Sequence, residues 1–244
     1  MRADLFDEMA HVQEKHWWFS ARRRILSALI ARLGLPSPAD VLEIGCGTGG
    51  NLAMLAQFGA VQAIEHNEEA RQIAMRLAVC PVHAGTLPEP IPYADHSFDL
   101  VCLFDVLEHI EDDAVALARA ARLLKTSGYL VLTVPAYRWL WSEHDVAHQH
   151  YRRYTAERVR TLATASGLTL VRVGYFNTLL FPLIACRRLM ARLGRRSNGS
   201  DAALPAPALN ALLAGVFGFE RHFLTRRFFP FGTSVVALLK AKDS

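Results

Sequence analysis

The segment SEHDVAHQHYRRY, residues 142–154, concentrates proton carriers and cations more than any other stretch of the sequence. Its candidate chemical groups are His144, Asp145, His148, His150, Arg152 and Arg153, with two tyrosines among them. Such a set suits a metal site, a catalytic base beside a cationic clamp for an anion, or a polar loop that only packs. The choice depends on what the rest of the chain builds around it.

A glycine-rich turn, VLEIGCGTGG at residues 41–50, is the second chemical feature. Glycine lets the backbone approach a ligand closely, and the N-terminus of a following helix offers free N–H groups. Gly45, Gly47 and Gly50 satisfy the spacing G-x-G-x-x-G. Glu65 follows at a predicted strand end, where a carboxylate can bind a ribose. The glycine pattern alone therefore fits an NAD-dependent oxidoreductase as well.

Acidic residues near this turn favour a cationic ligand. Glu43 precedes the first glycine by two positions, and Asp105 and Glu108 follow a predicted strand at the same rim. An acidic rim attracts a cofactor that carries an ammonium and a sulfonium, and it repels two phosphates. The surroundings of the turn thus favour a cationic cofactor over a dinucleotide.

The elements that must position these groups alternate along the chain. Residues 3–33 have apolar residues three and four positions apart, which predicts a helix that Gly and Pro then end. From there β-rich runs alternate with helical runs, which is typical of a parallel sheet covered by helices on both faces. The predicted strands are residues 41–45, 61–65, 79–83, 98–105, 128–135, 168–176 and a last strand near the C-terminus. Residues 177–224 are expected to be helical around a Gly/Ser/Pro-rich loop.

Four blocks, in this order, resemble the class I S-adenosylmethionine-dependent methyltransferases of the type 11/12 kind: VLEIGCGTGG, Glu65, IPYADHSFDLVCLFDVLEHIEDD and LLKTSGYLVLTVP. The resemblance implies an α/β fold with a Rossmann-like, doubly wound, seven-stranded and mostly parallel sheet whose last strand is antiparallel. N-terminal helices precede it, and a helical insert precedes the last strand. We expect one methyltransferase domain over residues 1–244. Its parts are an N-terminal helical lid (1–38), a cofactor-binding core (39–175), a helical insert (176–230) and the last strand (231–244).

The resemblance also implies cofactor contacts for S-adenosyl-L-methionine, with S-adenosyl-L-homocysteine as product. The positions expected along its methionine part are Glu43, Gly45, Gly47 and Gly49. Those expected beside the ribose and adenine are Glu65, His66, Thr86 and Leu87, although an aspartate that many relatives have near the last pair is absent. Asp105 and Val106 are expected to end the fourth strand beside the transferred methyl.

The segment HWWFSARRR, residues 16–24, resembles a lid found before the glycine turn in a subset of these enzymes. Trp17 and Trp18 are candidates to cover the cofactor, and Arg22 or Arg23 is a candidate to pair with its carboxylate. Simple packing of the aromatic pair is the alternative.

Methyl transfer from a sulfonium is an in-line displacement, so positioning and exclusion of water supply much of the rate. A hydroxyl acceptor must also lose its proton. Ligands of open α/β sheets bind outside the carboxyl ends of the strands, which places residues 142–154 on the acceptor side. The candidate proton acceptors are His109, His144, His148 and His150, and the candidate substrate-binding residues are Asp145, Arg152 and Arg153. We expect no metal, because only His144 and His148 have i, i+4 spacing and methyl transfer requires no Lewis acid here; a purely structural loop is the other alternative.

The net charge of +4 hides an asymmetry, since residues 1–150 hold 12 basic and 19 acidic residues and residues 151–244 hold 15 and 4. A basic, amphipathic insert suits an anionic membrane surface or a lipid-linked acceptor, with packing or a dimer interface as alternatives. The sequence shows no signal peptide, no membrane-spanning run and no CxxC pair, so we expect a cytoplasmic protein with possible peripheral contact at the inner membrane face. Nucleic acid is not expected as a partner.

These observations predict an S-adenosylmethionine-dependent methyltransferase, monomeric or homodimeric, that methylates a small or lipid-linked acceptor on oxygen. The alternatives are an NAD-dependent oxidoreductase and a non-catalytic protein that binds a cofactor or a membrane surface.

Overall fold

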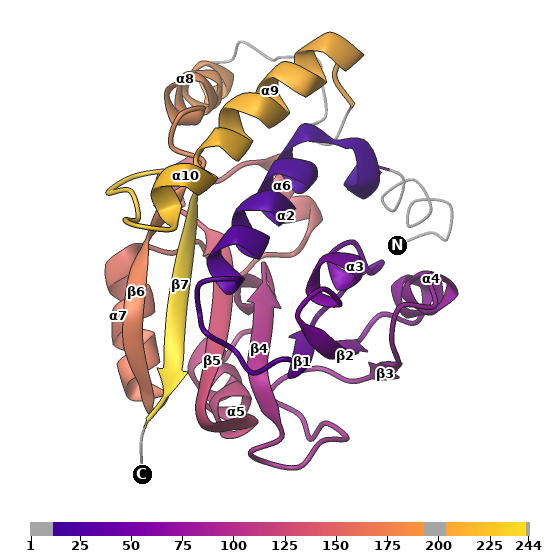
Figure 1. Cartoon of the computed structure of the whole chain (residues 1–244). Coiled ribbons are helices and arrows are strands. Elements are labelled where there is room, and N and C mark those ends of the chain that lie inside the picture. Colours follow the sequence, from indigo (N-terminus) through magenta and orange to yellow (C-terminus); the bar gives the residue numbers. More distant parts are fainter. Residues whose placement is uncertain (1–11, 193–203, 243–244) are drawn as a thin grey trace.

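The computed structural model describes residues 12–192 and 204–242, which form a seven-stranded sheet with helices on both faces (Figure 1). The strand order is β3-β2-β1-β4-β5-β7-β6. The strands are β1 (Ala39–Ile44), β2 (Gly59–Glu65), β3 (Val82–Ala84), β4 (Phe98–Phe104), β5 (Leu124–Pro135), β6 (Leu168–Phe176) and β7 (Ser234–Ala241). The pairs from β3 to β5 are parallel, and β7 is antiparallel to both of its neighbours. The predicted fold class is confirmed.

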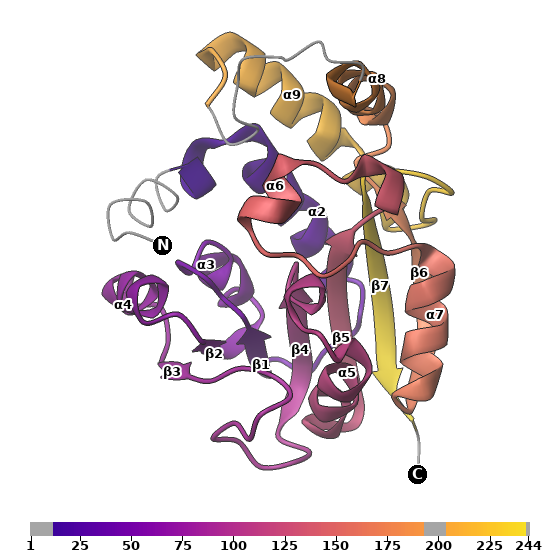
Figure 2. The ribbon, with the colours of Figure 1, turned by 180° about the vertical axis from the view of Figure 1, so that it is seen from behind.

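The helices divide between the two faces of the sheet (Figures 1 and 2). One face is covered by α5 (Asp113–Arg122) and α7 (Ala156–Ala165), and the other by α2 (Trp17–Ile30), α3 (Leu52–Leu55) and α4 (Glu68–Arg76). The short α6 (Glu143–Ala147) and the turns η1 (Leu107–His109) and η2 (Arg138–Leu140) lie in the connections after β4 and β5. These connections leave the carboxyl ends of the parallel strands, where ligands bind in such sheets.

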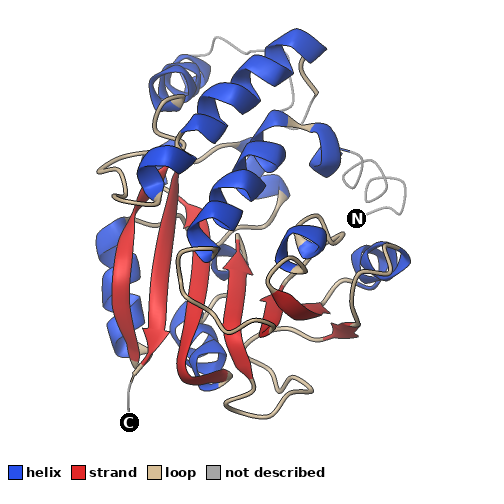
Figure 3. Ribbon diagram, viewed as in Figure 1, coloured by secondary structure: helices blue, strands red, loops and turns tan. Residues whose placement is uncertain are grey.

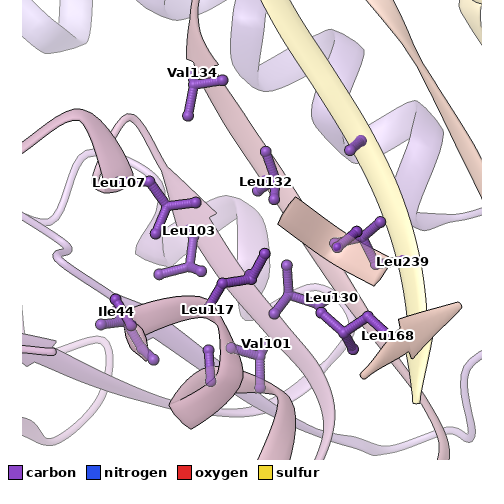
Figure 4. Packing of buried hydrophobic residues seen from close by; sticks show 14 of the residues in the cluster. Ile44, Val101, Leu103, Leu107, Leu117, Leu130, Leu132, Val134, Leu168 and Leu239 are labelled. Carbon is purple, nitrogen blue, oxygen red and sulfur yellow. The ribbon is translucent and has the colours of Figure 1, made fainter. Parts of the chain in front are cut away.

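The central strands are apolar along their whole length because both faces of the sheet are covered. Every residue of β4 except Asp99 is buried. Figure 4 shows Val101 and Leu103 of β4 packed with Leu130 and Leu132 of β5 on the α5 side of the sheet. Each fully buried leucine of this kind stabilises the fold by about 1.5–3 kcal/mol relative to an exposed one. The core thus fixes the strand ends that carry the polar residues described below.

The N-terminal helix is interrupted, contrary to the expectation of one continuous helix over residues 3–33. Residues 12–15 are helical, His16 is extended, and α2 begins at Trp17. The His16 ring accepts the backbone N–H of Trp18, as an N-cap does, so a new helix starts there. Residues 3–11 of the predicted helix lie outside the described residues.

The insert between β6 and β7 forms a cap of three helices, α8 (Phe181–Arg192), α9 (Pro207–Phe219) and α10 (Arg221–Leu224), beyond one end of the sheet (Figure 3). The cap is tied to the chain that leaves β6 by the buried carboxylate of Glu220, which accepts the backbone N–H groups of Asn177, Thr178 and Leu179. Phe217 of α9 packs against α2 in a separate apolar cluster. Most of the predicted Gly/Ser/Pro-rich loop falls in residues 193–203, outside the described residues.

Two further features of the fold concern membrane spans and thiols. Among the helices in the described parts of the chain, none has the length and apolarity that a membrane span requires. Cys46, Cys80, Cys102 and Cys186 are all free thiols.

Candidate active site

The glycine turn after β1 packs closely against the end of β4. Gly45 has φ +73°, and a Cβ there would lie 2.7 Å from a Val106 methyl group, so this position requires glycine for both conformation and space. Gly47 also has a positive φ, but a Cβ there would meet nothing within 4 Å. The turn is therefore packed at its base and open at Gly47, which is where a ligand can approach the backbone.

Glu65 is already oriented at the end of β2. Its Oε2 accepts the Gly47 N–H at 2.7 Å, and its Oε1 accepts the Asn67 N–H at 2.7 Å. A carboxylate oxygen has more than one lone pair, so both can still accept a hydroxyl hydrogen. The structure thus joins Glu65 to the glycine turn, with His66 exposed beside it.

Glu43 supports the turn from inside the fold. The side chain is fully buried, and Oε1 accepts a hydrogen bond from Asn51 Nδ2 at 2.7 Å. Oε2 is buried without a hydrogen-bond partner among the described residues. Burial raises the pKa of Glu43 to about 7, while the Asn51 hydrogen bond acts in the opposite direction.

The N-terminal segment reaches the site through one of its two candidate arginines. Arg22 is buried and pairs with Asp105, with 2.7 Å between Nη1 and Oδ2, and its guanidinium lies 4.8 Å from the Trp18 ring. Arg23 instead donates to the backbone carbonyls of Gln13 and Glu14. Arg22 and Trp18 therefore lie at the site, whereas Arg23 holds the preceding helical segment in place.

Trp17 and the preceding Gln13 make contacts that the sequence did not predict. Trp17 packs against Phe217 of the cap and donates its backbone N–H to Asn210. Gln13 contacts the glycine turn: its Oε1 accepts from Thr48 Oγ1 at 2.8 Å. A Cβ on Gly50 would lie 2.6 Å from the same Gln13 oxygen. Sequence reasoning missed Gln13, since no pattern distinguishes it from a surface glutamine.

Asp105 closes β4 in a left-handed backbone conformation, with φ +58°. Its backbone N–H donates to the Thr133 carbonyl, and Thr133 Oγ1 donates to its Oδ1 at 3.2 Å. Asp105 and Val106 thus stand between the glycine turn and β5. On the far side, Leu87 is buried in the core and Thr86 is half-buried, so Thr86 is the more accessible of the pair.

All four candidate proton acceptors come together. The ring centroids are 4.6 Å apart for His109 and His150 and 4.2 Å apart for His144 and His148. The His148 and His150 rings, 6.2 Å apart, connect the two pairs. Burial, then His150 and His148, lowers the pKa of His109 to about 4, and burial also lowers the pKa of His148. Both imidazoles are therefore neutral near pH 7 and can accept a proton.

The predicted substrate contact Asp145 is instead the centre of the loop. It is fully buried, and its two oxygens accept from His150 Nδ1, from Nε and Nη2 of Arg153, and from Ser142. Burial acts to raise the pKa of Asp145, but the hydrogen bonds from His150 and Arg153 outweigh it and hold this pKa well below its usual range. We therefore revise the role of Asp145 from substrate binding to positioning His150.

The two arginines of the loop are also committed to partners within the chain. Arg153 binds Asp145 through two nitrogens and donates to the Ala136 carbonyl. Arg152 pairs with Asp113 at 2.9 Å and donates to the Glu111 carbonyl. An anionic acceptor would have to displace these contacts, so the geometry does not support the predicted anion clamp.

Comparison with known proteins finds methyltransferases. A family model described as a methyltransferase domain matches residues 18–173, well over half of the chain. A Mycobacterium tuberculosis protein named as a probable S-adenosylmethionine-dependent methyltransferase is 32% identical over 123 residues, covering 50% of this chain and 43% of that protein. The ubiquinone biosynthesis O-methyltransferase of Thiobacillus denitrificans is 29% identical over 140 residues, covering 51% and 58%. The chain thus spans about half the length of the curated relatives it matches.

Solved structures share the fold. A chain from the complex between the Haloferax volcanii Trm112 methyltransferase activator and its methyltransferase has a TM-score of 0.65 at 17% identity, covering 99% of this chain and 96% of that chain. Haemonchus contortus phosphoethanolamine N-methyltransferase 2, in complex with S-adenosyl-L-methionine, has a TM-score of 0.59 at 19% identity, covering 88% and 51%. At these identities the likeness concerns the fold alone.

Proposed function

The chain belongs to the class I S-adenosylmethionine-dependent methyltransferase superfamily, and on that basis we propose that it transfers a methyl group from S-adenosylmethionine to an oxygen of a small or lipid-linked acceptor. The observation that carries the acceptor side of this proposal is the cluster of His109, His144, His148 and His150. A hydroxyl must lose a proton on methylation, and the imidazole of a histidine can accept it.

The cofactor side follows from the open face of the glycine turn. The bound cofactor supplies a sulfonium methyl group and an excellent leaving group. Glu65 would hold its ribose hydroxyls, and the backbone at Gly47 would lie along its methionine part. Arg22, which pairs with Asp105 and stacks on the Trp18 ring, would exchange Asp105 for the carboxylate of the cofactor. These residues bind and orient, and the lid excludes water.

The choice of oxygen rests on the histidines and on relatives. The Thiobacillus denitrificans relative and a second relative, from Aspergillus sclerotiorum, are both named O-methyltransferases. A further relative is named dimethylglycine N-methyltransferase. A tertiary amine has no proton to lose, so a site that methylates one needs no cluster of imidazoles. The cluster therefore favours a hydroxyl.

The lipid-linked acceptor and a peripheral contact with anionic membrane are supported by the cap. An apolar groove of about 520 Å³ is lined by Leu179 and by residues of α9, among them Leu212, Val216 and Phe219. Leu183, Leu212, Phe219 and Phe223 are all exposed on the cap helices. Apolar side chains among arginines are typical of helices that lie on anionic lipid. Such a protein would work at the cytoplasmic membrane face.

The proposal is tested by transfer of a labelled methyl group from S-adenosylmethionine into quinols, sugars and lipid extracts. We expect the label in the methyl group of a methyl ether or methyl ester. His148→Ala should lower kcat by about 10²–10⁴-fold, the usual contribution of a general base, without changing affinity for S-adenosylhomocysteine. The control, His222→Ala, changes an exposed histidine on α10 and should affect neither quantity. Cofactor binding without transfer to any acceptor would instead identify a non-catalytic cofactor-binding protein.

A further inference from the structure

Glu108, in the turn η1 after β4, is a buried carboxyl group without a partner. Its exposed fraction is 1%, and neither oxygen has a hydrogen-bond partner in the part of the chain that the structure describes. Burying a carboxyl without hydrogen bonds is costly, so such a group is either protonated or neutralised by a cation. The backbone carbonyl of the same residue accepts the Tyr151 N–H at 2.7 Å. The side chain can therefore take a ligand that the described residues do not supply.

Two imidazoles face the same point. One oxygen of Glu108 and one ring nitrogen each of His109 and His150 all lie within 4.8 Å of one another. They come from two segments, the turn after β4 and the loop after β5, that the fold brings together. Because Nδ1 of His150 is bound to Asp145, Nε2 is the nitrogen that remains for a ligand.

The contacts of His150 match those that orient metal-binding histidines. Such histidines usually bind a carboxylate or carbonyl through the nitrogen that is not on the metal, which fixes the tautomer and the ring orientation. Asp145 provides that carboxylate, and Arg153 in turn fixes Asp145 through two nitrogens. The loop thus holds His150 in place before any ligand binds.

We propose that Glu108, His109 and His150 bind one divalent transition-metal ion. Two imidazoles and one carboxylate are a common set for Zn²⁺, Fe²⁺ and related ions, and they leave further positions open. Bonds of about 2.0–2.2 Å would draw the three donor atoms together from their present spacing. Mg²⁺ suits the set less well, because it prefers oxygen ligands.

This site differs from the possible metal site within residues 142–154 that the sequence suggested. That candidate combined His144, Asp145, His148 and His150 within one loop. In the structure Asp145 is fully occupied by Arg153, Ser142 and His150, and the buried carboxyl that remains is Glu108.

The role of the ion rests on the proposed function, whereas its binding does not. An ion at this site can bind the acceptor hydroxyl as a Lewis acid and lower the pKa of that hydroxyl. The hydroxyl proton passes to His148, a new oxygen–carbon bond forms to the methyl group, and the sulfur–carbon bond breaks with its electron pair on sulfur. In this arrangement His109 and His150 hold the ion, while His148 and His144 are the histidines that accept the hydroxyl proton.

The test is titration of the metal-stripped full chain with ZnCl₂, MnCl₂ and MgCl₂ by isothermal calorimetry, without cofactor. We expect one Zn²⁺ or Mn²⁺ per chain and weaker binding of Mg²⁺. Glu108→Gln and His109→Ala should weaken the binding at least about tenfold, and Asp145→Asn about 10–100-fold through His150. Glu111→Gln, an exposed carboxyl three residues away, is the matched control and should bind as the unmodified chain does.

Circular dichroism of each variant shows whether the fold persists, and Glu108→Gln keeps the shape of the side chain. Absence of a bound ion, or equal affinity of the Glu108→Gln and Glu111→Gln variants, would overturn the proposal. Calorimetry with S-adenosylhomocysteine on the same samples separates the two claims. Cofactor binding without metal binding overturns only the metal site, and the reverse overturns only the proposed function.

Discussion

Asparagine in place of Asp145 tests the claim that this residue organises the loop of residues 142–154. Asp145 is fully buried, and Arg153, whose side chain is 9% exposed, donates to it at 2.7 and 2.9 Å. Asp145→Asn removes the negative charge and leaves the buried guanidinium without an anion. Removing one partner of a buried ion pair costs about 3–5 kcal/mol. Arg153 keeps its hydrogen bond to the Ala136 carbonyl, so we expect the lower end, about 3 kcal/mol.

The assay is urea unfolding followed by circular dichroism and tryptophan fluorescence, together with thermal melting. For a chain of this length about 3 kcal/mol corresponds to a fall in Tm of roughly 6–12 °C. Asp95→Asn is the control, because Asp95 also binds two arginines, Arg119 and Arg122, at 2.7 and 2.6 Å, but at the surface. Its Tm should change far less. Equal falls in Tm for the two variants would refute the role given to Asp145.

Three further predictions concern the cofactor side. Gly45→Ala should lower the free energy of unfolding in urea more than Gly167→Ala does. Both glycines have φ near +73°, but only at Gly45 would the added Cβ lie 2.7 Å from a Val106 methyl group. Equal losses would show that backbone conformation alone matters. Glu65→Gln should weaken binding of S-adenosylhomocysteine by about 10–100-fold in calorimetry, the value of a hydrogen bond to a charged group, and unchanged affinity would remove Glu65 from the ribose site. Burial raises the pKa of Glu43 from 4.5 to about 7, so folding favours the protonated form of this carboxyl. The free energy of unfolding should therefore fall by about 3 kcal/mol as the pH rises from 4.5 to about 7. Glu43→Gln should flatten this part of the stability–pH curve, and parallel curves for the two proteins would contradict the assignment.

The strands and the glycine turn were predictable from the sequence because their signals are local. Strands buried on both faces give continuous apolar runs such as residues 98–104, and only glycine tolerates a turn as close to Val106 as the one at Gly45. The meeting of His109 with the loop histidines was also predictable, since the carboxyl ends of adjacent parallel strands share one edge of the sheet.

The partners of the charged residues were not predictable, because they depend on side-chain direction. Arg152 and Arg153 are adjacent in the sequence, yet one pairs with Asp113 of α5 and the other with Asp145. A cluster of cations on a loop looks the same in the sequence whether it binds a substrate or its own chain. Glu108 presents the opposite case, since nothing in the sequence distinguishes a buried carboxyl without a partner from the exposed Glu111 beside it.

The interruption of the N-terminal helix has a similar cause. The apolar spacing of residues 3–33 continues through His16, and only the hydrogen bond between its ring and the Trp18 N–H marks the break. That break places Gln13 against Thr48 and Arg22 against Asp105, so the contacts of the N-terminal segment depend on a detail that periodicity does not record.

The most direct test of the central claim is thermal melting of the full chain with S-adenosylhomocysteine and, separately, with NADH. Ligand at about 100 times its Kd stabilises a folded protein by about 2.7 kcal/mol, or roughly 5–11 °C in Tm for a chain of this length. We predict a dose-dependent rise of this size with S-adenosylhomocysteine and no change with NADH. A rise with NADH and none with S-adenosylhomocysteine would contradict the account.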